Sequence, residues 1–319
     1  MRTSASDLAI WFVGRFPSFS KWWLRKWAGY YQGISGKPHW LLLRLTDHLG
    51  YRIPVRLRLG NGMPIVVSWR DFVGEQIRLT GFFEHQTIDV LRACLRPGFV
   101  FFDVGAHVGQ YTLLGSSWVG DSGEVHSFEP DPETFALLET NVRLNRLRNV
   151  QLNKIALSDE VGSKPLFQAG LNNPGANSLV PQGKHEGEKH IQVSVSTLDD
   201  YVRLKGIPRI DFLKVDIEGE ELRFLRGATI LAKWTPPLII EFNQASLIAA
   251  GSSCRMLAGC LTQMGYVLYR IGNWPLCKYE ENDSDGSVFN VLALTSHGRK
   301  AWSANRSPSD ALMFDSTRS

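Results

Sequence analysis

The chain has 319 residues, of which 44% are hydrophobic and 21% are charged, so it can bury a full-sized core. It holds no run of 18 or more apolar residues, and no small-residue cleavage site follows the short apolar stretch LAIWFVG. We therefore expect neither a transmembrane span nor a secretory signal. The four cysteines form no C-x-x-C pair and no zinc-like spacing, which favours reduced thiols in a cytoplasmic protein.

The net charge of +4 is distributed unevenly along the chain. Residues 1–60 contain ten Lys or Arg and two Asp or Glu, and five of the ten tryptophans lie within the first 40 residues. A basic, aromatic segment of this kind is typical of peripheral contact with an anionic membrane surface, here the inner membrane face. It is equally typical of a helix that covers a catalytic domain with its aromatic side. We expect residues 1–83 to form an extension, ending in a hairpin, ahead of the catalytic domain.

The elements predicted after this segment alternate between strands and helices. Two short strands flank Gly-Asn-Gly within residues 52–70, which is typical of a hairpin, and a helix is expected over residues 84–95. Five strands follow, at residues 100–104, 124–130, 150–157, 210–219 and 237–243. Helices are expected at residues 110–118, 132–145, just before Gly227, and 254–264. The last two strands, YVLYRIG and VFNVLALT, are joined by a polar loop, so we expect them to pair antiparallel.

This alternation predicts an α/β fold with a mostly parallel, doubly wound sheet over residues 84–297. Residues 160–209 interrupt the alternation with a segment rich in Gly, Asn, Pro and Ser, which predicts a long lid or substrate loop. The tail, residues 298–319, has the composition of a disordered segment.

A carboxylate precedes the first turn of the predicted sheet. Asp103 ends an apolar strand and is followed by Gly105-x-x-x-Gly109, whereas a dinucleotide-binding turn has the pattern G-x-G-x-x-G. A carboxylate there would repel a pyrophosphate. It suits a ligand that carries a positive ammonium or sulfonium and no phosphate, which indicates S-adenosylmethionine.

Two further acidic residues follow later strands, where ligands bind in open α/β sheets. Glu129 is placed to accept hydrogen bonds from both ribose hydroxyls, a feature shared with NAD enzymes. Asp159 could accept from the adenine amino group or cap a turn. His107, inside the glycine turn, is interpreted as a cofactor-contacting loop residue rather than a base. Asp131, directly before a proline, is better explained as a helix cap.

Five motifs carry a resemblance to a known family. They are FFDVGAHVGQYT, HSFEPDPETFALLETNVRLN, IALSD, VSTLDDY and DFLKVDIEGEELRFLRGA, and they follow one another in the right order and spacing between residues 100 and 243. Together they resemble the FkbM family of S-adenosylmethionine-dependent methyltransferases. The resemblance implies a class I methyltransferase sheet of seven strands, the last antiparallel, and methyl transfer to a hydroxyl of a natural product or of a sugar in a glycan.

The family motif K-x-D-x-E-G-x-E falls on Lys214, Asp216, Glu218, Gly219 and Glu221 without departure. The sequence departs from the family at His107, where an Asn is usual. The resemblance does not extend to the basic N-terminal segment or to the tail.

The carboxylates at the ends of the fourth and fifth strands are the candidate catalytic groups. An alcohol loses its proton as it attacks, which calls for a positioned base or for a metal ion that lowers its pKa. Asp216 and Glu218, two residues apart on a strand end, are expected to point the same way, with Glu241 on the neighbouring strand. Asp216, Glu218 and Glu221 are also candidate ligands of Mg²⁺. Alternatively, Asp216 and Glu221 have a structural role alone, in which they cap the short helix that follows and accept hydrogen bonds from loop amides.

Two other classes of function stay open. A nicotinamide-dependent oxidoreductase is disfavoured by the glycine spacing and by Asp103. A catalytically silent module that binds S-adenosylmethionine is compatible with the fold alone. We expect no nucleic-acid substrate, because the chain after residue 60 is mildly acidic and contains no N-P-P-Y stretch.

Overall fold

The computed structural model describes residues 54–68, 71–169, 174–181, 189–272, 275–280 and 288–295. The predictions for the tryptophan-rich segment and for the tail lie outside the described residues. Within the described part of the chain, no helix is long and apolar enough to cross a membrane. The chain divides into two compact units, residues 1–83 with 170–175, and residues 84–169 with 176–319.

The described part of the first unit is a hairpin followed by a helix. Strands β1 (Pro54–Arg58) and β2 (Pro64–Ser68) pair antiparallel, which confirms the predicted hairpin. Gly62 supplies the positive φ of +88° that the turn requires. Helix α4 (Phe72–Thr80), which the sequence analysis did not predict, begins where the Asp71 side chain accepts a hydrogen bond from the amide of Val73.

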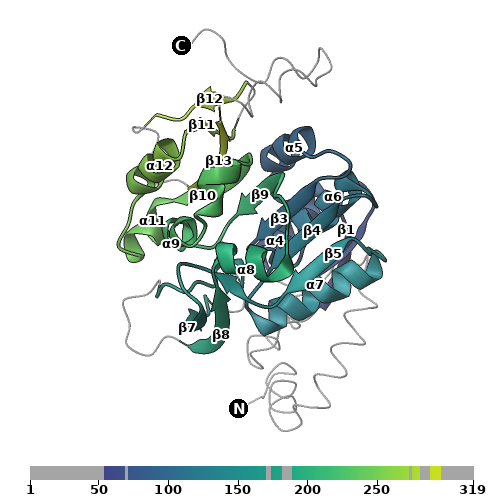
Figure 1. Ribbon diagram of the computed structural model, residues 1–319. Coiled ribbons are helices and arrows are strands. Elements are labelled where there is room, and N and C mark those ends of the chain that lie inside the picture. Colours follow the sequence, from purple (N-terminus) through teal and green to yellow (C-terminus); the bar gives the residue numbers. More distant parts are fainter. Residues whose placement is uncertain are drawn as a thin grey trace, which may run out of the picture. The chain divides into compact units, whose positions relative to one another are not determined.

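The second unit is built on one central sheet of eight strands (Figure 1). Their order in space is β12-β11-β13-β10-β9-β3-β4-β5. The strands are β3 (Val100–Val104), β4 (Glu124–Phe128), β5 (Val150–Asn153), β9 (Phe212–Val215), β10 (Leu238–Asn243), β11 (Tyr266–Arg270), β12 (Cys277–Lys278) and β13 (Val288–Thr295). From β5 to β10 the strands are parallel, and β13 runs antiparallel to both β10 and β11. This is the predicted class I methyltransferase sheet, with the two-residue β12 as an added edge strand.

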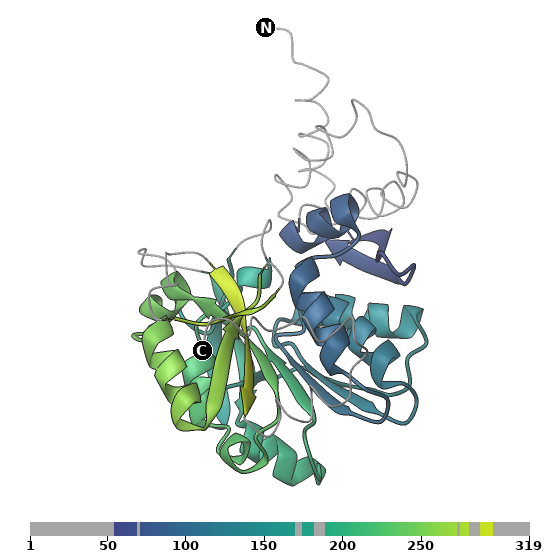
Figure 2. The same ribbon diagram turned by 90° about the horizontal axis from the view of Figure 1, so that it is seen from above.

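Helices cover both faces of this sheet. They are α5 (His85–Cys94), α6 (Gln110–Val119), α7 (Pro132–Leu144), α8 (Leu198–Lys205), α9 (Glu221–Arg226), α10 (Ile230–Trp234), α11 (Gln244–Ala249) and α12 (Cys254–Gln263). Right-handed crossovers put helices on opposite faces where the strand order reverses. Figure 2 shows the blue-to-teal helices α6 and α7 on one side of the sheet and the green α12 on the other. The reversal lies between β3 and β9, which is where ligands bind in such sheets.

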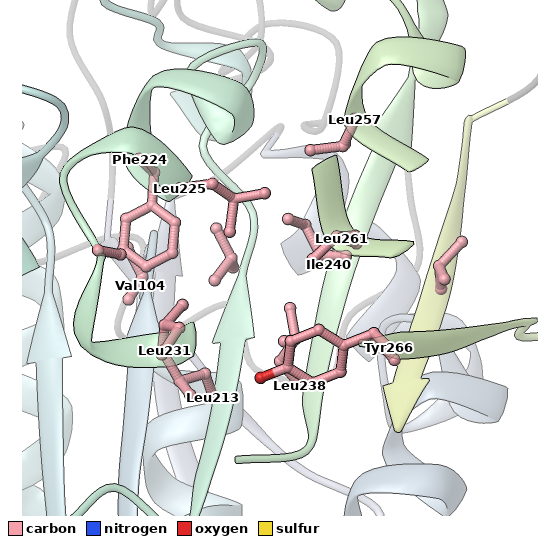
Figure 3. Packing of buried hydrophobic residues seen from close by; sticks show 14 of the residues in the cluster. Val104, Leu213, Phe224, Leu225, Leu231, Leu238, Ile240, Leu257, Leu261 and Tyr266 are labelled. Carbon is pink, nitrogen blue, oxygen red and sulfur yellow. The ribbon is translucent and has the colours of Figure 1, made fainter. Parts of the chain in front are cut away.

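The hydrophobic core that holds the site rigid lies between the sheet and the helices α9 and α12 (Figure 3). Leu213, Leu238 and Ile240 contribute from the strands, and Phe224, Leu225, Leu257 and Leu261 contribute from the helices. Tyr266 is buried here as well, and its hydroxyl donates to the carbonyl of Pro236 at 2.8 Å. Because parallel strands are buried on both faces, every residue of β9 is buried, including Lys214.

The prediction for residues 150–209 is wrong in two respects. The third strand ends at Asn153, and β6 (Ala156–Leu157) belongs to a separate sheet of order β6-β8-β7. Much of the expected lid is this small sheet, formed with β7 (Gly162–Phe167) and β8 (His190–Ser196), followed by α8. In β8, Val193 and Val195 are buried while Ser194 is exposed. This part of the sequence therefore has the two-residue alternation of a strand, although the segment as a whole is polar.

Candidate functional site

The turn after β3 brings two strand ends into contact. Gly105, at φ +81°, lies so close to the end of β9 that an added Cβ would sit 1.8 Å from the carbonyl oxygen of Asp216. Gly109, at φ +95°, begins α6, and an added Cβ there would lie 2.5 Å from the Leu138 side chain. Both glycines are therefore required for close packing as well as for their backbone conformation.

Asp103 is fully buried beneath this turn. Its Oδ2 accepts a hydrogen bond from Thr112 Oγ1 at 2.6 Å, while Oδ1 is buried and has no hydrogen-bond partner among the described residues. Burial raises the pKa of Asp103, and the nearby charge of Lys214 opposes that rise. A buried carboxylate oxygen without a partner is rare in proteins, so this atom fits a donor that the described residues do not supply.

Glu129 joins the glycine turn to the end of β4. Its carboxylate is 8% exposed, and it accepts from the amide of His107 at 3.0 Å and from the amide of Asp131 at 2.9 Å. These two bonds hold the Glu129 carboxylate at the junction of the glycine turn and the end of β4. His107 contributes its amide to this link from a left-handed backbone conformation, with φ +50°. The Asp131 side chain caps α7, as predicted.

Asp159 lies elsewhere than the sequence analysis assumed. It follows β6 in the small sheet, and the third strand of the central sheet ends six residues earlier at Asn153. The Asp159 carboxylate accepts from Ser158 Oγ at 3.1 Å and forms an ion pair with Lys164 at 3.2 Å. Its contact with adenine stays a prediction, now without the strand-end argument that supported it.

Three carboxylates converge at the ends of β9 and β10. Oxygen atoms of Asp216, Glu218 and Glu241 lie within 4.8 Å of one another. The reason differs from the expected one, because β9 already ends at Val215 and Glu218 has a left-handed conformation at φ +52°. The side chains of Asp216 and Glu218 are therefore brought together by the turn after β9 and not by the two-residue repeat of a strand.

Glu221, the third carboxylate of the family motif, does not belong to this cluster. Its two oxygens accept from the amides of Ile217 and Gly219 at 3.0–3.2 Å. Burial, reinforced by the charge of Asp216, raises the pKa of Glu221 to about 8, although these amide bonds oppose the rise. Glu221 therefore supports the turn that carries Asp216 and Glu218, which is one of the two roles left open for it.

A buried lysine supplies positive charge to the cluster. Lys214 is 1% exposed, and its ammonium lies 2.8 Å from Asp216 Oδ2 and 4.5 Å from the centre of the Tyr111 ring. Burial lowers the pKa of Lys214, but the charges of Asp216, Asp103 and Glu84 outweigh it and raise the value to about 12. The sequence analysis matched Lys214 to a motif without assigning it a role. The signal was a lysine within an apolar strand, FLKV.

Glu84 is a second residue whose place near the site was not predicted from the sequence, where it is only the first residue of an expected helix. Its carboxylate accepts from the Tyr111 hydroxyl at 2.6 Å, and burial followed by the charge of Asp216 raises its pKa. No motif pointed to it, because the contact joins residues 27 positions apart.

The converging carboxylates have different affinities for protons. Burial and the charge of Asp216 raise the pKa of Glu218 to about 7, while hydrogen bonds from Ser246 at 3.2 Å and Asn243 at 3.1 Å oppose the rise. Burial and the charge of Asp216 also raise the pKa of Glu241, and its Oε2 has no hydrogen-bond partner among the described residues. The cluster therefore combines two carboxyl groups with raised pKa values and an ion-paired aspartate, which suits proton transfer.

The chain matches a family described as "Methyltransferase FkbM domain" over residues 103–268. It is 30% identical over 160 residues to 31-O-demethyl-FK506 methyltransferase FkbM of Streptomyces tacrolimicus, a match that covers 42% of this chain and 60% of that protein. It is 30% identical over 153 residues to methyltransferase sdnD of Sordaria araneosa, covering 39% and 58%. Hexuronic acid methyltransferase AglP of Haloferax volcanii is 25% identical over 177 residues, covering 54% and 64%. The chain thus spans about three fifths of the length of these relatives.

Solved structures with a similar arrangement are distant in sequence. An S-adenosylmethionine-dependent O-methyltransferase from Thermotoga maritima has a TM-score of 0.41 at 11% identity, covering 79% of this chain and 81% of that one. Aeropyrum pernix fibrillarin in complex with S-adenosylmethionine has a TM-score of 0.37 at 12% identity, covering 76% and 82%. Because the family match takes in more than half of the sequence, from Asp103 to Leu268, the chain belongs to the FkbM methyltransferase domain family.

Proposed function

We propose that the protein is an S-adenosylmethionine-dependent O-methyltransferase that acts on a hydroxyl group of a sugar, glycan or natural-product acceptor. The observation that carries this proposal is the contact between Gly105 and Asp216, because it puts the candidate cofactor turn directly beside the acidic cluster. The names of two relatives, an O-demethyl-FK506 methyltransferase and a hexuronic acid methyltransferase, support the reaction and the acceptor class.

The residues of the turn fit S-adenosylmethionine and disfavour a phosphate-bearing cofactor. Asp103 offers a buried oxygen without a hydrogen-bond partner among the described residues, and we propose that Glu129, which is anchored to the amides of His107 and Asp131, accepts from the ribose hydroxyls. A carboxylate at this position would repel a pyrophosphate, which argues against a nicotinamide cofactor. When bound, S-adenosylmethionine supplies an activated methyl group, so formation of the acceptor O–C bond breaks the S–C bond and releases a thioether.

The chain's own contribution is to orient the acceptor and to take its proton. Asp216, held by Lys214, is the residue we propose to orient the hydroxyl. The proton passes to the carboxylate cluster, where Glu218, with a pKa of about 7, is suited to accept it at neutral pH. In a second version of the proposal, Mg²⁺ bound by Asp216, Glu218 and Glu241 lowers the pKa of the hydroxyl instead.

Calorimetry tests the cofactor assignment. We expect the full chain to bind S-adenosylmethionine and its demethylated product but not NAD. Glu129→Ala should weaken binding at least tenfold, because each hydrogen bond to a charged acceptor is worth roughly 1.5–3 kcal/mol. The matched control is Asp121→Ala, which removes an exposed carboxylate before the opposite end of β4. If affinity in Glu129→Ala equals that of the control, the ribose assignment is wrong.

Acceptors are then sought by transfer of a labelled methyl group to sugars and to hydroxylated macrocycles. Transfer that depends on Asp216 supports the enzyme. Binding of S-adenosylmethionine without transfer to any member of either class would favour a silent binding module instead.

A further inference from the structure

Two neighbouring side chains beside the acidic cluster each carry a buried oxygen that lacks a partner. Glu241 on β10 and Asn290 on β13 are both 6% exposed. Within the described part of the chain, neither Glu241 Oε2 nor Asn290 Oδ1 has a hydrogen-bond partner. The two residues are directly paired across the antiparallel strands, so their side chains emerge on the same face of the sheet. Buried polar atoms are rarely left unpaired, and two on directly paired residues indicate hydrogen-bond donors other than the described residues.

Asn290 also lines a pocket at the same edge of the sheet. The pocket has a volume of about 550 Å³ and is formed by the start of α5, the end of β11 and the start of β13, with Glu84, Thr87 and Phe289 among its lining residues. This volume is in the range of small-molecule sites. Asn290 Nδ2 donates to Thr87 Oγ1 at 3.2 Å, which fixes the amide and leaves Oδ1 as the free acceptor.

The pocket lies beside the candidate reacting groups. Asn243, which ends β10, pairs with Val288, which begins β13. The mouth of the pocket is therefore at the carboxyl edge of the sheet, two residues along β10 from Glu241. Glu84 belongs both to the pocket lining and to the group of charges around Lys214.

We propose that this pocket is the acceptor subsite, and that the acceptor is a polyhydroxylated ring such as a sugar rather than a largely apolar macrocycle. The inference rests on the proposed function and narrows its acceptor class. A sugar presents several hydroxyl donors on one ring, so one of them can bond to Asn290 Oδ1 in the pocket lining while another is directed toward Glu241, the residue paired with Asn290 on β10. The side chains of Glu84 and Thr87 continue the polar lining, and the Phe289 ring adds an apolar surface. An acceptor with few hydroxyls would leave buried polar atoms unpaired, and sites built this way reject such ligands strongly.

The test uses saturation-transfer NMR and titration on the full chain, with and without S-adenosylhomocysteine. The probes are methyl α-D-glucopyranoside and methoxycyclohexane, which has a ring of similar size without hydroxyls. We expect the glycoside to bind and methoxycyclohexane not to bind. Asn290→Leu should weaken glycoside binding about tenfold or more, the effect of losing a hydrogen bond to a buried group, while affinity for S-adenosylhomocysteine is unchanged.

Two further variants keep the test decisive. Thr87→Val removes the hydroxyl that orients the Asn290 amide, so it should weaken glycoside binding even if Asn290→Leu does not fold. Gln151→Leu, at an exposed position on β5 at the other edge of the sheet, is the control and should bind the glycoside normally.

Three results would overturn the proposal: no binding of the glycoside, stronger binding of methoxycyclohexane, or equal glycoside affinity in Asn290→Leu, Thr87→Val and the control. A different result would contradict the proposed function: no binding of S-adenosylhomocysteine to the full chain. The acceptor subsite is tested separately, by glycoside binding measured without S-adenosylhomocysteine.

Discussion

Asp216 is the residue on which the proposed chemistry most depends. It directly follows the buried strand β9 and is ion-paired with Lys214 at 2.8 Å. Its carboxylate oxygens also lie among those of Glu218 and Glu241. The ammonium of Lys214 holds the Asp216 carboxylate in place, so Asp216 is positioned to orient a hydroxyl.

Replacing Asp216 by Asn keeps the shape of the side chain and removes its charge. We expect Asp216→Asn to lower turnover by about 10²–10⁴, the range typical of positioned acid–base groups. Affinity for S-adenosylmethionine should change little, because the cofactor contacts assigned here lie on Asp103 and Glu129. Single-turnover transfer and calorimetry measure the two effects, with the melting temperature as a check on folding. Near-normal turnover would make the cluster structural and turn attention to Glu218 and Glu241.

The same carboxylates decide whether a metal takes part. If Mg²⁺ holds the acceptor oxygen, EDTA should abolish transfer and added Mg²⁺ should restore it. If the carboxylates act directly, EDTA should leave the rate unchanged. The ammonium of Lys214 already compensates one negative charge at this place, so we expect the second result. If EDTA abolishes methyl transfer and added Mg²⁺ restores it, the expectation that the carboxylates act without a metal is wrong.

Glu221 makes stability depend on pH with a defined sign. Its pKa rises from 4.5 to about 8 on folding, so the folded chain binds more protons than the unfolded chain between these values. Stability should therefore fall as pH rises from about 4.5 to about 8. Glu221→Gln retains an acceptor for the amides of Ile217 and Gly219 and cannot titrate. Urea unfolding at pH 5 and pH 8 should show a smaller loss in the variant than in the wild type. Equal losses would mean that Glu221 is not the titrating group.

At the scale of elements, the turn between β3 and α6 determines the geometry of the site. Its first glycine lies against the backbone of Asp216, and this contact can be tested directly. In Gly105→Ala, the new Cβ would meet the Asp216 carbonyl oxygen at 1.8 Å, in addition to the strain of a positive φ. Gly120→Ala is the matched control, because Gly120 has φ +64° with no heavy atom within 4 Å of the new Cβ.

We expect Gly120→Ala to cost about 1–3 kcal/mol, because Gly120 has φ 64° and ψ −175°, a backbone conformation that is nearly restricted to glycine. Gly105→Ala should cost at least about 4 kcal/mol, since one of two strand ends must move. It should also weaken binding of S-adenosylmethionine. Denaturant unfolding and calorimetry measure both quantities. Similar losses of stability in the two variants would show that the close approach of β3 and β9 is not essential.

The elements also show which patterns were informative. Strands β3, β9 and β10 are short apolar runs bounded by polar or glycine residues, and a parallel sheet buries such runs on both faces. They were therefore predictable. Strands β7 and β8 were missed, because a half-buried strand keeps polar residues on its exposed face and glycine-rich loops surrounded it. Helix α4 was missed beside the predicted hairpin, although Asp71 gave an N-cap signal.

At the scale of the whole molecule, the basic N-terminal segment is predicted to position the enzyme and to take no part in its chemistry. Removal of the first 35 residues should therefore leave affinity for S-adenosylmethionine unchanged, as measured by calorimetry. The full chain should sediment with anionic vesicles at low salt, and the truncated chain should do so less, because the first 60 residues carry ten Lys or Arg. Full-length protein that ignores anionic vesicles at low salt would contradict the membrane interpretation.

The sequence by itself determined the succession of the main strands of the central sheet along the chain, the glycine turn with its carboxylate and the family of the chain. These features depend on residues near one another in the sequence, where periodicity, turn chemistry and spacing act directly. The tertiary structure decided what depends on long-range contact. It placed Asp159 after a strand of a second sheet, engaged Glu221 with backbone amides, and brought Glu84 and Lys214 to Asp216. It also paired Glu241 with Asn290, 49 positions further along the chain, across two antiparallel strands. Burial is what raises the pKa values of Glu84, Glu221 and Glu241, and burial is a property of the packed sheet that no local pattern carries.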